Sequence, residues 1–324
     1  MINELISVVV PAYNCAPWLP RCLDSLLSQT YPNLEIIVVN DGSTDNTEDV
    51  LDIYASKDSR IQCVHQENRG VTSARLAGVR VAKGQWISFA DSDDELAPEM
   101  LTHLMENAGK YDADISHCGF QEIHPDGRVN QLHGTGLLKV QGRKIALQDL
   151  LEEKIVEPSL CTKLFKAELF TGLEEKMDTG LKNNEDMLMN YFLFDRASRV
   201  IFEDICLYNY LIRQGSASRR KLSPYLIYDP IRVRQIILDN CEPELKEDAR
   251  RALVRMCLVS YRLLAMETEQ EYEEDRKNIR QILVQQLPYC SVLSRRNAIL
   301  VRMIAWAPCF FDRLYPSFER IFRK

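Results

Sequence analysis

The sequence predicts an α/β fold, in which a mostly parallel sheet flanked by helices is followed by an all-helical C-terminal region. Short apolar runs begin near residues 5, 35, 61 and 86, which is the spacing of repeated β-α-β units. From residue 225 onward, apolar side chains recur only at helical spacing. We therefore expect one domain over residues 1–224 and a helical region over residues 225–324.

Apolar, β-branched runs predict the strands, and stretches with one apolar face predict the helices. Residues 121–141 carry a turn at Pro125–Gly127 and are otherwise expected to be irregular. The predicted strands are Leu5–Val10, Glu35–Val39, Ile61–Val64, Trp86–Ala90, Asp114–Phe120 and Val200–Tyr210. The predicted helices are one after Pro17, one after Asp45, Val71–Ala82, Pro98–Tyr111, Ile145–Glu153, Thr162–Phe170, Glu185–Arg196, Leu226–Leu238, Glu244–Met266 and Tyr272–Leu287.

The composition narrows the class of protein. A hydrophobic fraction of 46% and a charged fraction of 27% are typical of a soluble globular protein, and the net charge of -7 argues against a general nucleic-acid binder. The ten cysteines form no Cys-x-x-Cys pair, so zinc and redox motifs are unsupported. Met1–Glu4 do not resemble a secretory signal, and no apolar run approaches the length of a membrane span. We expect a cytoplasmic protein.

An acidic stretch directly follows the fourth predicted strand. Trp86–Ala90 is apolar and leads into Asp91, Ser92, Asp93 and Asp94. Ligands of open α/β sheets bind at the carboxyl ends of strands, and hard carboxylate oxygens suit Mg²⁺ or Mn²⁺ that shares its shell with substrate phosphates. The alternative is a solvated turn in which one aspartate caps the next helix.

Further polar residues follow the other predicted strands. Each of them alone has an ordinary structural explanation, as a loop residue, an Asx-turn, a turn glycine or a surface charge. Their common position on one rim of the sheet favours a binding site. These residues are Pro11, Ala12, Tyr13 and Asn14 after strand one, Asp41 after strand two, and Asn68, Gly70 and Arg75 after strand three.

Over about residues 5–220 the sequence resembles the family 2 glycosyltransferases, which are inverting enzymes with the GT-A fold, a Rossmann-like architecture. Four segments carry the resemblance: Val8–Asn14 as the opening strand, Val38–Asp45 as the nucleotide loop, Asn68–Arg75 as the third block and Phe89–Asp94 as the DxD block. Residues 1–224 are then the catalytic domain.

The resemblance implies a set of donor-binding residues. Tyr13 and Asp41 would hold the nucleobase, Arg75 would fix the nucleotide, Asp91 would contact the ribose side, and Asp93 would bind Mg²⁺ or Mn²⁺. The same loops add Pro11, Ala12 and Ser92 to the donor site.

Two later segments complete the resemblance. Asn184–Leu188 is similar to the family's Glu-Asp motif, which implies Asp186 as the catalytic base and Glu185 as the second choice. The alternative is an ordinary helix start, with an asparagine cap and acids that suit the helix dipole. Tyr208–Ser216 is similar to a segment that closes over the donor, so Arg213 and Ser216 could reach the diphosphate; the alternative is a solvated basic loop.

The resemblance implies a metal-dependent inverting transferase. It would move one sugar from a nucleotide-diphosphate sugar, UDP-linked by expectation, to a hydroxyl of a glycan or lipid-linked acceptor in bacterial surface-polysaccharide synthesis. One alternative is a non-catalytic nucleotide-sugar-binding protein on the same fold. Another is a nucleotidyltransferase, which needs a Gly- and Lys/Arg-rich loop after the first strand; Pro11–Cys15 contains no such residue.

The C-terminal stretch Arg295–Lys324 combines apolar clusters with seven basic and two acidic residues. A basic, aromatic-rich amphipathic segment is typical of contact with an anionic membrane surface. The alternative is a helix packed on the catalytic domain with its arginines in solvent. We expect peripheral association with the inner face of the cytoplasmic membrane.

Overall fold

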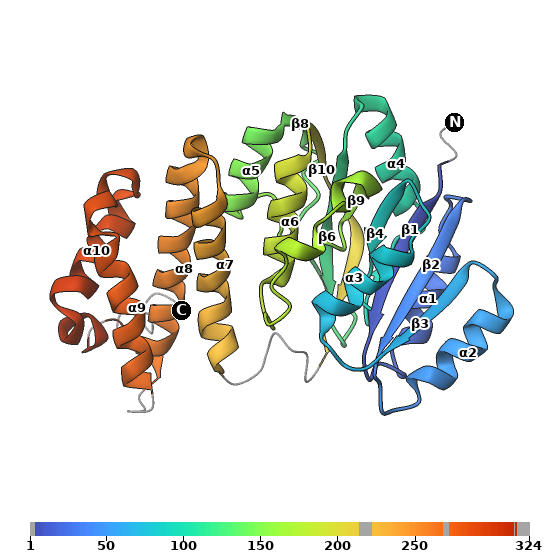
Figure 1. The fold of residues 1–324 in the computed structure, drawn as a ribbon, viewed down its shortest axis with the longest axis horizontal. Helices are drawn as coiled ribbons and strands as arrows, with labels where there is room; N and C mark the ends of the chain where they lie inside the picture. The colour runs from blue at the N-terminus through green and yellow to red at the C-terminus, as the bar shows by residue number, and fades with distance from the viewer. Residues whose placement is uncertain (1–3, 214–221, 268–271, 314, 316–324) are drawn as a thin grey trace. The chain divides into compact units, whose positions relative to one another are not determined.

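The computed structural model describes residues 4–213, 222–267, 272–313 and 315 (Figure 1). The chain divides into two compact units, residues 1–221 and 222–324. The first is an α/β unit built on one large sheet, and the second is helical. This arrangement confirms the predicted fold class.

Within the described residues the sheet has ten strands, in the order β3-β2-β1-β4-β9-β6-β10-β5, with β7 paired to β6 and β8 paired to β10. Strands β1 to β4 are parallel, as are β6 and β10, while β5, β7, β8 and β9 run antiparallel to their neighbours. The strands are β1 (Ile6–Ala12), β2 (Leu34–Asp41), β3 (Ile61–Gln66), β4 (Trp86–Phe89), β5 (Glu95–Leu96), β6 (Ile115–Ile123), β7 (Val129–Gln131), β8 (Leu138–Gly142), β9 (Lys163–Lys166) and β10 (Arg199–Leu211).

Helices of the first unit cover the sheet and position the site. Strand β1 is buried over Ile6–Val10, as expected for a parallel strand covered on both faces. Helix α3 packs on β1 and β2, and Gly78 permits this approach because a Cβ there would lie 2.4 Å from Val9 Cγ1. The helices are α1 (Leu19–Leu27), α2 (Thr47–Lys57), α3 (Val71–Val81), α4 (Met100–Tyr111), α5 (Arg143–Glu152) and α6 (Glu185–Arg196), with short 3₁₀ turns η1 (Ala167–Phe170) and η2 (Glu174–Lys176).

Two local predictions were wrong. The expected helix Thr162–Phe170 is instead strand β9 followed by η1, because residues 163–166 pair with both β4 and β6 in the middle of the sheet. Residues 121–141 are not irregular: β7 pairs back onto β6 across the turn at Pro125–Gly127, and β8 pairs with β10. In both places pairing with distant strands outweighs the local pattern.

The described part of the second unit consists of α-helices and two short 3₁₀ helices. Ala298, Val301 and Ile304 are buried on one side of α10, which contacts α8 and α9. No helix in the described ranges is long and apolar enough to span a bilayer. The elements are α7 (Pro224–Asn240), η4 (Pro243–Leu245), α8 (Lys246–Met266), α9 (Glu273–Gln285), η6 (Leu287–Val292) and α10 (Arg295–Trp306).

Candidate active site

The carboxyl ends of neighbouring parallel strands bring the predicted donor-binding residues to one edge of the sheet. Strand β1 lies between β2 and β4, so Tyr13, Asp41 and Asp91 stand at three adjacent strand ends. Arg75 comes from the second turn of α3, which begins beyond the same edge. This edge is where open α/β sheets bind ligands.

The buried side chain of Arg75 joins the two parts of the predicted site. Its guanidinium forms ion pairs with Asp91 at 3.1 Å and with Glu185 at 3.3 Å, and a third ion pair with Asp186. Only 4% of the Arg75 side chain is exposed, so solvent screens these pairs weakly. A single cation thus holds the acidic strand end against the N-terminus of α6.

Asp186 has the electrostatic character of a general base that works near neutral pH. Burial raises the pKa of Asp186 to about 7, although the guanidinium of Arg75 opposes the shift. The negative charges of Glu185 and Asp91 add to the increase. A base is most effective when its pKa lies near the working pH, because it is then both free to accept a proton and basic enough to do so.

Asp41 lies buried at the end of β2, and its carboxylate holds the turn that precedes α3. Its Oδ1 accepts hydrogen bonds from the Arg69 backbone N–H at 2.9 Å and from the Gln66 side chain at 2.6 Å. Its Oδ2 accepts the N–H of Gly70 at 2.9 Å, and Gly70 has a φ of +86°, a conformation that favours glycine. Asp41 therefore fixes the turn from which α3 carries Arg75 into the site. Its contact with a nucleobase stays a prediction.

The loop after β1 presents one aromatic ring to solvent. Tyr13 is 51% exposed, and the next residue, Asn14, accepts a hydrogen bond from the Thr44 backbone N–H at 2.7 Å. This contact ties together the loops that follow β1 and β2. A ring on a fixed loop is available to stack on a planar base; the donor-binding roles of Tyr13, Pro11 and Ala12 stay predictions.

Asp93, the predicted metal ligand, forms an ion pair with Arg213. The guanidinium of Arg213 also lies over the ring of Trp18, 4.1 Å from its centroid. Burial raises the pKa of Asp93, and the charge of Arg213 opposes that increase. Ser92 is nearly buried between the two aspartates of the motif. Ser216 lies outside the described residues.

Two buried residues to which the sequence assigns no role, Asp94 and Tyr208, support the acidic turn. The Asp94 carboxylate accepts hydrogen bonds from the Tyr208 hydroxyl and from the Leu211 backbone N–H, both at 2.9 Å. The Tyr208 hydroxyl in turn accepts the N–H of Asp91 at 3.2 Å. The signal available in the sequence was weak: a further aspartate beyond the Asp-x-Asp pattern, and a tyrosine at the start of the segment predicted to close over the donor.

A cavity of about 300 Å³ lies against the Asp91 and Asp186 carboxylates. Its walls combine acidic and aromatic side chains, which suits a polyhydroxylated ligand because carboxylates accept hydroxyl hydrogen bonds and rings contact apolar faces. The side chains that matter here are Glu122, Glu157, Phe120, Tyr208 and Tyr210.

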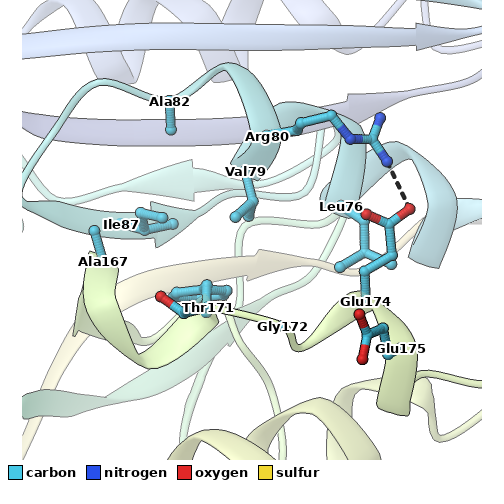
Figure 2. A pocket seen from close by; sticks show the side chains of 11 residues that line it. Leu76, Val79, Arg80, Ala82, Ile87, Ala167, Thr171, Gly172, Glu174 and Glu175 are labelled. Carbon is cyan, nitrogen blue, oxygen red and sulfur yellow. Dashed lines mark hydrogen bonds and ion pairs between the residues drawn. The ribbon is translucent and has the colours of Figure 1, made fainter.

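A larger cavity, of about 710 Å³, lies elsewhere, between α3 and residues 167–175 (Figure 2). It is lined by apolar side chains such as Leu76 and Ile87, and by the ion pair of Arg80 with Glu174 at 2.6 Å. None of the predicted site residues that the structure describes lines this cavity. We therefore locate the candidate active site at the smaller cavity.

The carboxylates at the sheet edge fit a divalent cation that binds together with a phosphate ligand. Among the described residues, no group of three or more His, Cys, Asp and Glu side chains is placed to hold an ion unaided. Asp93 offers hard oxygens and its side chain is 21% exposed. Mg²⁺ commonly takes one or two protein carboxylates and completes its shell with water and substrate phosphates.

The family model for glycosyl transferase family 2 matches residues 7–172, just over half of the chain. The chain belongs to this family. The resemblance found in the sequence is thereby confirmed for residues 7–172, which form a glycosyl transferase family 2 domain. The matched region contains both the acidic strand end and Arg75.

Curated relatives of this family 2 enzyme include bacterial glycosyltransferases. The chain is 34% identical to the uncharacterized glycosyltransferase EpsJ of Bacillus subtilis over 68% of its length, and the match spans 64% of EpsJ. It is 31% identical to glycosyltransferase GlyG of Streptococcus pneumoniae over 74% of its length and 81% of GlyG. The chain thus spans less than two thirds of EpsJ.

Solved structures share the fold of this family 2 enzyme. Residues 1–349 of Staphylococcus aureus TarS, in complex with UDP, superpose with a TM-score of 0.71 at 20% identity, covering 98% of this chain and 91% of that one. Another TarS structure contains UDP-GlcNAc. A Pyrobaculum calidifontis mannosyltransferase with GDP-Man and Mn²⁺ has a TM-score of 0.55 at 16% identity, covering 100% and 89% of the two chains. These likenesses confirm the GT-A fold.

Proposed function

We propose that this glycosyltransferase moves one sugar from a UDP-linked donor to a hydroxyl of a glycan or lipid-linked acceptor in bacterial surface-polysaccharide synthesis, and that it inverts the anomeric configuration. The observation that carries the proposal is the position of Arg75, which pairs with Asp91 on the donor side and with Asp186 beside the cavity. The UDP and UDP-GlcNAc bound to TarS support the choice of donor.

In this proposal Asp186 takes the proton of an acceptor hydroxyl held in the cavity of about 300 Å³. The acceptor oxygen attacks the anomeric carbon as the bond to the diphosphate breaks, so one displacement inverts that carbon and needs no covalent sugar-enzyme intermediate. Glu185, which shares Arg75 with Asp186, is the second choice for the base.

The donor end of the site would be completed by Mg²⁺ or Mn²⁺ at Asp93. Such an ion supplies positive charge that stabilises the departing diphosphate. Asp93 now pairs with Arg213, so we propose that this arginine leaves the carboxylate when the donor binds and turns toward the diphosphate. Tyr13 would then stack on the base, while the Asp41 carboxylate keeps the α3 turn in place.

A screen of UDP-glucose, UDP-galactose and UDP-GlcNAc, each with and without Mn²⁺, tests the proposal. A ligand at about 100 times its Kd stabilises a protein by about 2.7 kcal/mol, which a thermal-shift assay resolves. We expect one donor to bind and to release UDP slowly by hydrolysis. Binding of a donor without release of UDP, and without sugar transfer to any acceptor that is tried, would support the non-catalytic alternative.

We also propose that α10 contacts the inner face of the cytoplasmic membrane. One side of this helix is buried within the helical unit, but its other side exposes Ile299 and Trp306, the latter by 73%, and Phe310 follows beyond it. The exposed residues of α10 also include Arg295, Arg296 and Arg302, and Arg313 is exposed beyond the end of the helix. Exposed apolar and cationic groups on one segment suit anionic lipid.

Co-sedimentation with anionic phosphatidylglycerol vesicles tests the membrane proposal. The full chain should pellet, less so at high salt, because the arginine contribution is screened. Trp306→Ser with Phe310→Ser should reduce pelleting, whereas Val259→Ser, which removes an exposed apolar group from α8, should not. Equal behaviour of all three proteins would mean that the surface is not a membrane contact.

A further inference from the structure

Lys163, at the start of β9, is fully buried, and its ammonium group donates hydrogen bonds to backbone carbonyl oxygens. Its Nζ donates a hydrogen bond to the Glu157 carbonyl at 2.7 Å and another to the Ser159 carbonyl, and it lies 3.4 Å from the Thr162 hydroxyl. Burying an ammonium group is costly unless it is well bonded, so this arrangement is a strong local constraint. The part of the chain that these hydrogen bonds constrain is the segment 157–162.

The same segment is held from the other side by α6. Asn190 of α6, also buried, donates through Nδ2 to the Pro158 carbonyl at 2.6 Å and to the Asp186 carbonyl at 3.0 Å. The segment in turn contacts the proposed base, because the Leu160 backbone N–H lies 3.4 Å from Asp186 Oδ2. Two buried side chains therefore fix the segment that touches Asp186.

The segment also shapes the cavity beside Asp186. Glu157, Ser159 and Thr162 all line it, and two of them supply the carbonyls that Lys163 holds. A shift of the segment would therefore change both the hydrogen bond to Asp186 and the wall that faces an acceptor.

We propose that Lys163 is a positioning residue, which acts on proton transfer and acceptor binding through the segment 157–162 without touching substrate. The catalytic consequence rests on the proposed function, whereas the effect of Lys163 on the segment and on Asp186 does not. Nothing in the proposed chemistry uses Lys163 directly, and its ammonium points at the backbone.

The surrounding charges determine the direction in which the pKa of Asp186 should shift when Lys163 is replaced. Burial lowers the pKa of Lys163 to about 8, against the opposing charges of Glu157 and Asp186, so the ammonium form still predominates at pH 7. Loss of this cation, and of the Leu160 N–H bond to Asp186, would both raise the pKa of Asp186. The other titratable groups facing Lys163 are His117 and Cys118 of β6 and Cys161, and those facing Asp186 are Arg75, Glu185 and Asp91.

The test compares Lys163→Met with Lys166→Met in the full chain. Lys166 is a matched control because it lies on the same strand and pairs with Asp114 at 2.7 Å, away from the cavity. Hydrogen exchange measured by mass spectrometry should show the backbone amides of Glu157 and residues 159–162 exchanging about tenfold faster in Lys163→Met, and unchanged in the control.

Titration of ¹³C-aspartate by NMR gives the second readout, with the Asp186 signal assigned by its loss in Asp186→Asn. In Lys163→Met the pKa of Asp186 should rise by roughly 0.5 to 1 unit, and in Lys166→Met it should not move. If Lys163→Met fails to fold, Asn190→Ala, which releases the Pro158 carbonyl on the α6 side, carries the same two measurements with the same expected direction. A folded variant with normal exchange and an unshifted Asp186 would overturn the proposal.

Measurements of enzyme activity distinguish a failure of this inference from a failure of the proposed function. With a donor and acceptor that the wild type turns over, Lys163→Met should lower kcat and raise the acceptor KM while leaving the donor KM unchanged, and the acid limb of its pH profile should move upward. A wild type that transfers no sugar would contradict the proposed function alone, because the exchange and titration results do not depend on transfer. An equal loss of kcat in Lys166→Met would contradict the specific role of Lys163.

Discussion

Arg75 and Asp186 lie 111 residues apart in the sequence and form a direct ion pair. One comes from the second turn of α3 and the other from the first turn of α6, so the pair fixes the proposed base relative to the sheet edge at which we propose that the donor binds. The same guanidinium reaches Asp91, so movement of either helix would disturb the proposed donor side and the proposed base together.

Arg75→Lys should reduce kcat/KM by about 10²-fold, because an ammonium group cannot match three carboxylates at once and small displacements of catalytic groups are costly. Arg80→Lys is the matched control: Arg80 lies on the same helix, and its pair with Glu174 is exposed and away from the site. Steady-state kinetics with the donor found in the screen gives the comparison. Equal losses in both variants would show that α3, and not the Arg75 network, is what matters.

The rate of transfer should depend on pH through Asp186. The carboxylate form is the base, so activity should fall about tenfold per pH unit below a pKa of about 7 and level off above it. A profile of kcat/KM between pH 5.5 and 8.5, taken with circular dichroism to confirm folding, checks this. A flat profile across pH 7 would argue that Asp186 is not the titrating base.

Asp41→Asn should destabilise the protein as well as weaken donor binding. Its carboxylate accepts two backbone N–H groups and a glutamine side chain, and an amide nitrogen would leave one donor unpaired in a buried place. The expected cost is about 2 to 3 kcal/mol of unfolding free energy, measured by urea denaturation. Asp126→Asn, in an exposed turn, should leave the midpoint unchanged. A fully stable Asp41→Asn protein would mean that the carboxylate serves the ligand alone.

Asp93→Asn should abolish the gain in donor affinity that Mn²⁺ provides, because it removes a hard anionic ligand. Calorimetric titration of the donor, with Mn²⁺ and after chelation, measures that gain. In the wild type, chelation should weaken binding; in the variant, it should have little further effect. A variant that still gains affinity from Mn²⁺ would place the ion elsewhere.

The position of the proposed nucleotide-binding residues was predictable because they follow adjacent parallel strands. Local patterns fix the ends of β1, β2 and β4, and the parallel order of those strands brings Tyr13, Asp41 and Asp91 to one edge. What each side chain does there was less predictable. Asp41 turned out to accept backbone N–H groups, a contact that depends on the positive φ of Gly70.

The rest of the site depends on pairings that leave little trace in the sequence. Residues 163–166 look helical by periodicity, yet they enter the sheet between β4 and β6. This placement buries Lys163, whose ammonium group holds the carbonyl of Glu157, a residue that lines the cavity beside Asp186. The contact of Tyr208 with Asp94 likewise joins residues 114 positions apart, which no local pattern indicates.

The role of Asp186 is tested most directly by comparing Asp186→Asn with the wild type for donor binding and sugar transfer in parallel. We expect nearly unchanged binding of the UDP-sugar with Mn²⁺, and a fall in transfer of about 10² to 10⁴-fold, the usual contribution of a positioned base. Glu185→Gln should reduce the transfer rate less, because Glu185 also forms an ion pair with Arg75, at 3.3 Å, but is not assigned the proton transfer. An unchanged transfer rate in Asp186→Asn, with Glu185→Gln inactive, would contradict the assignment and move the base by one residue.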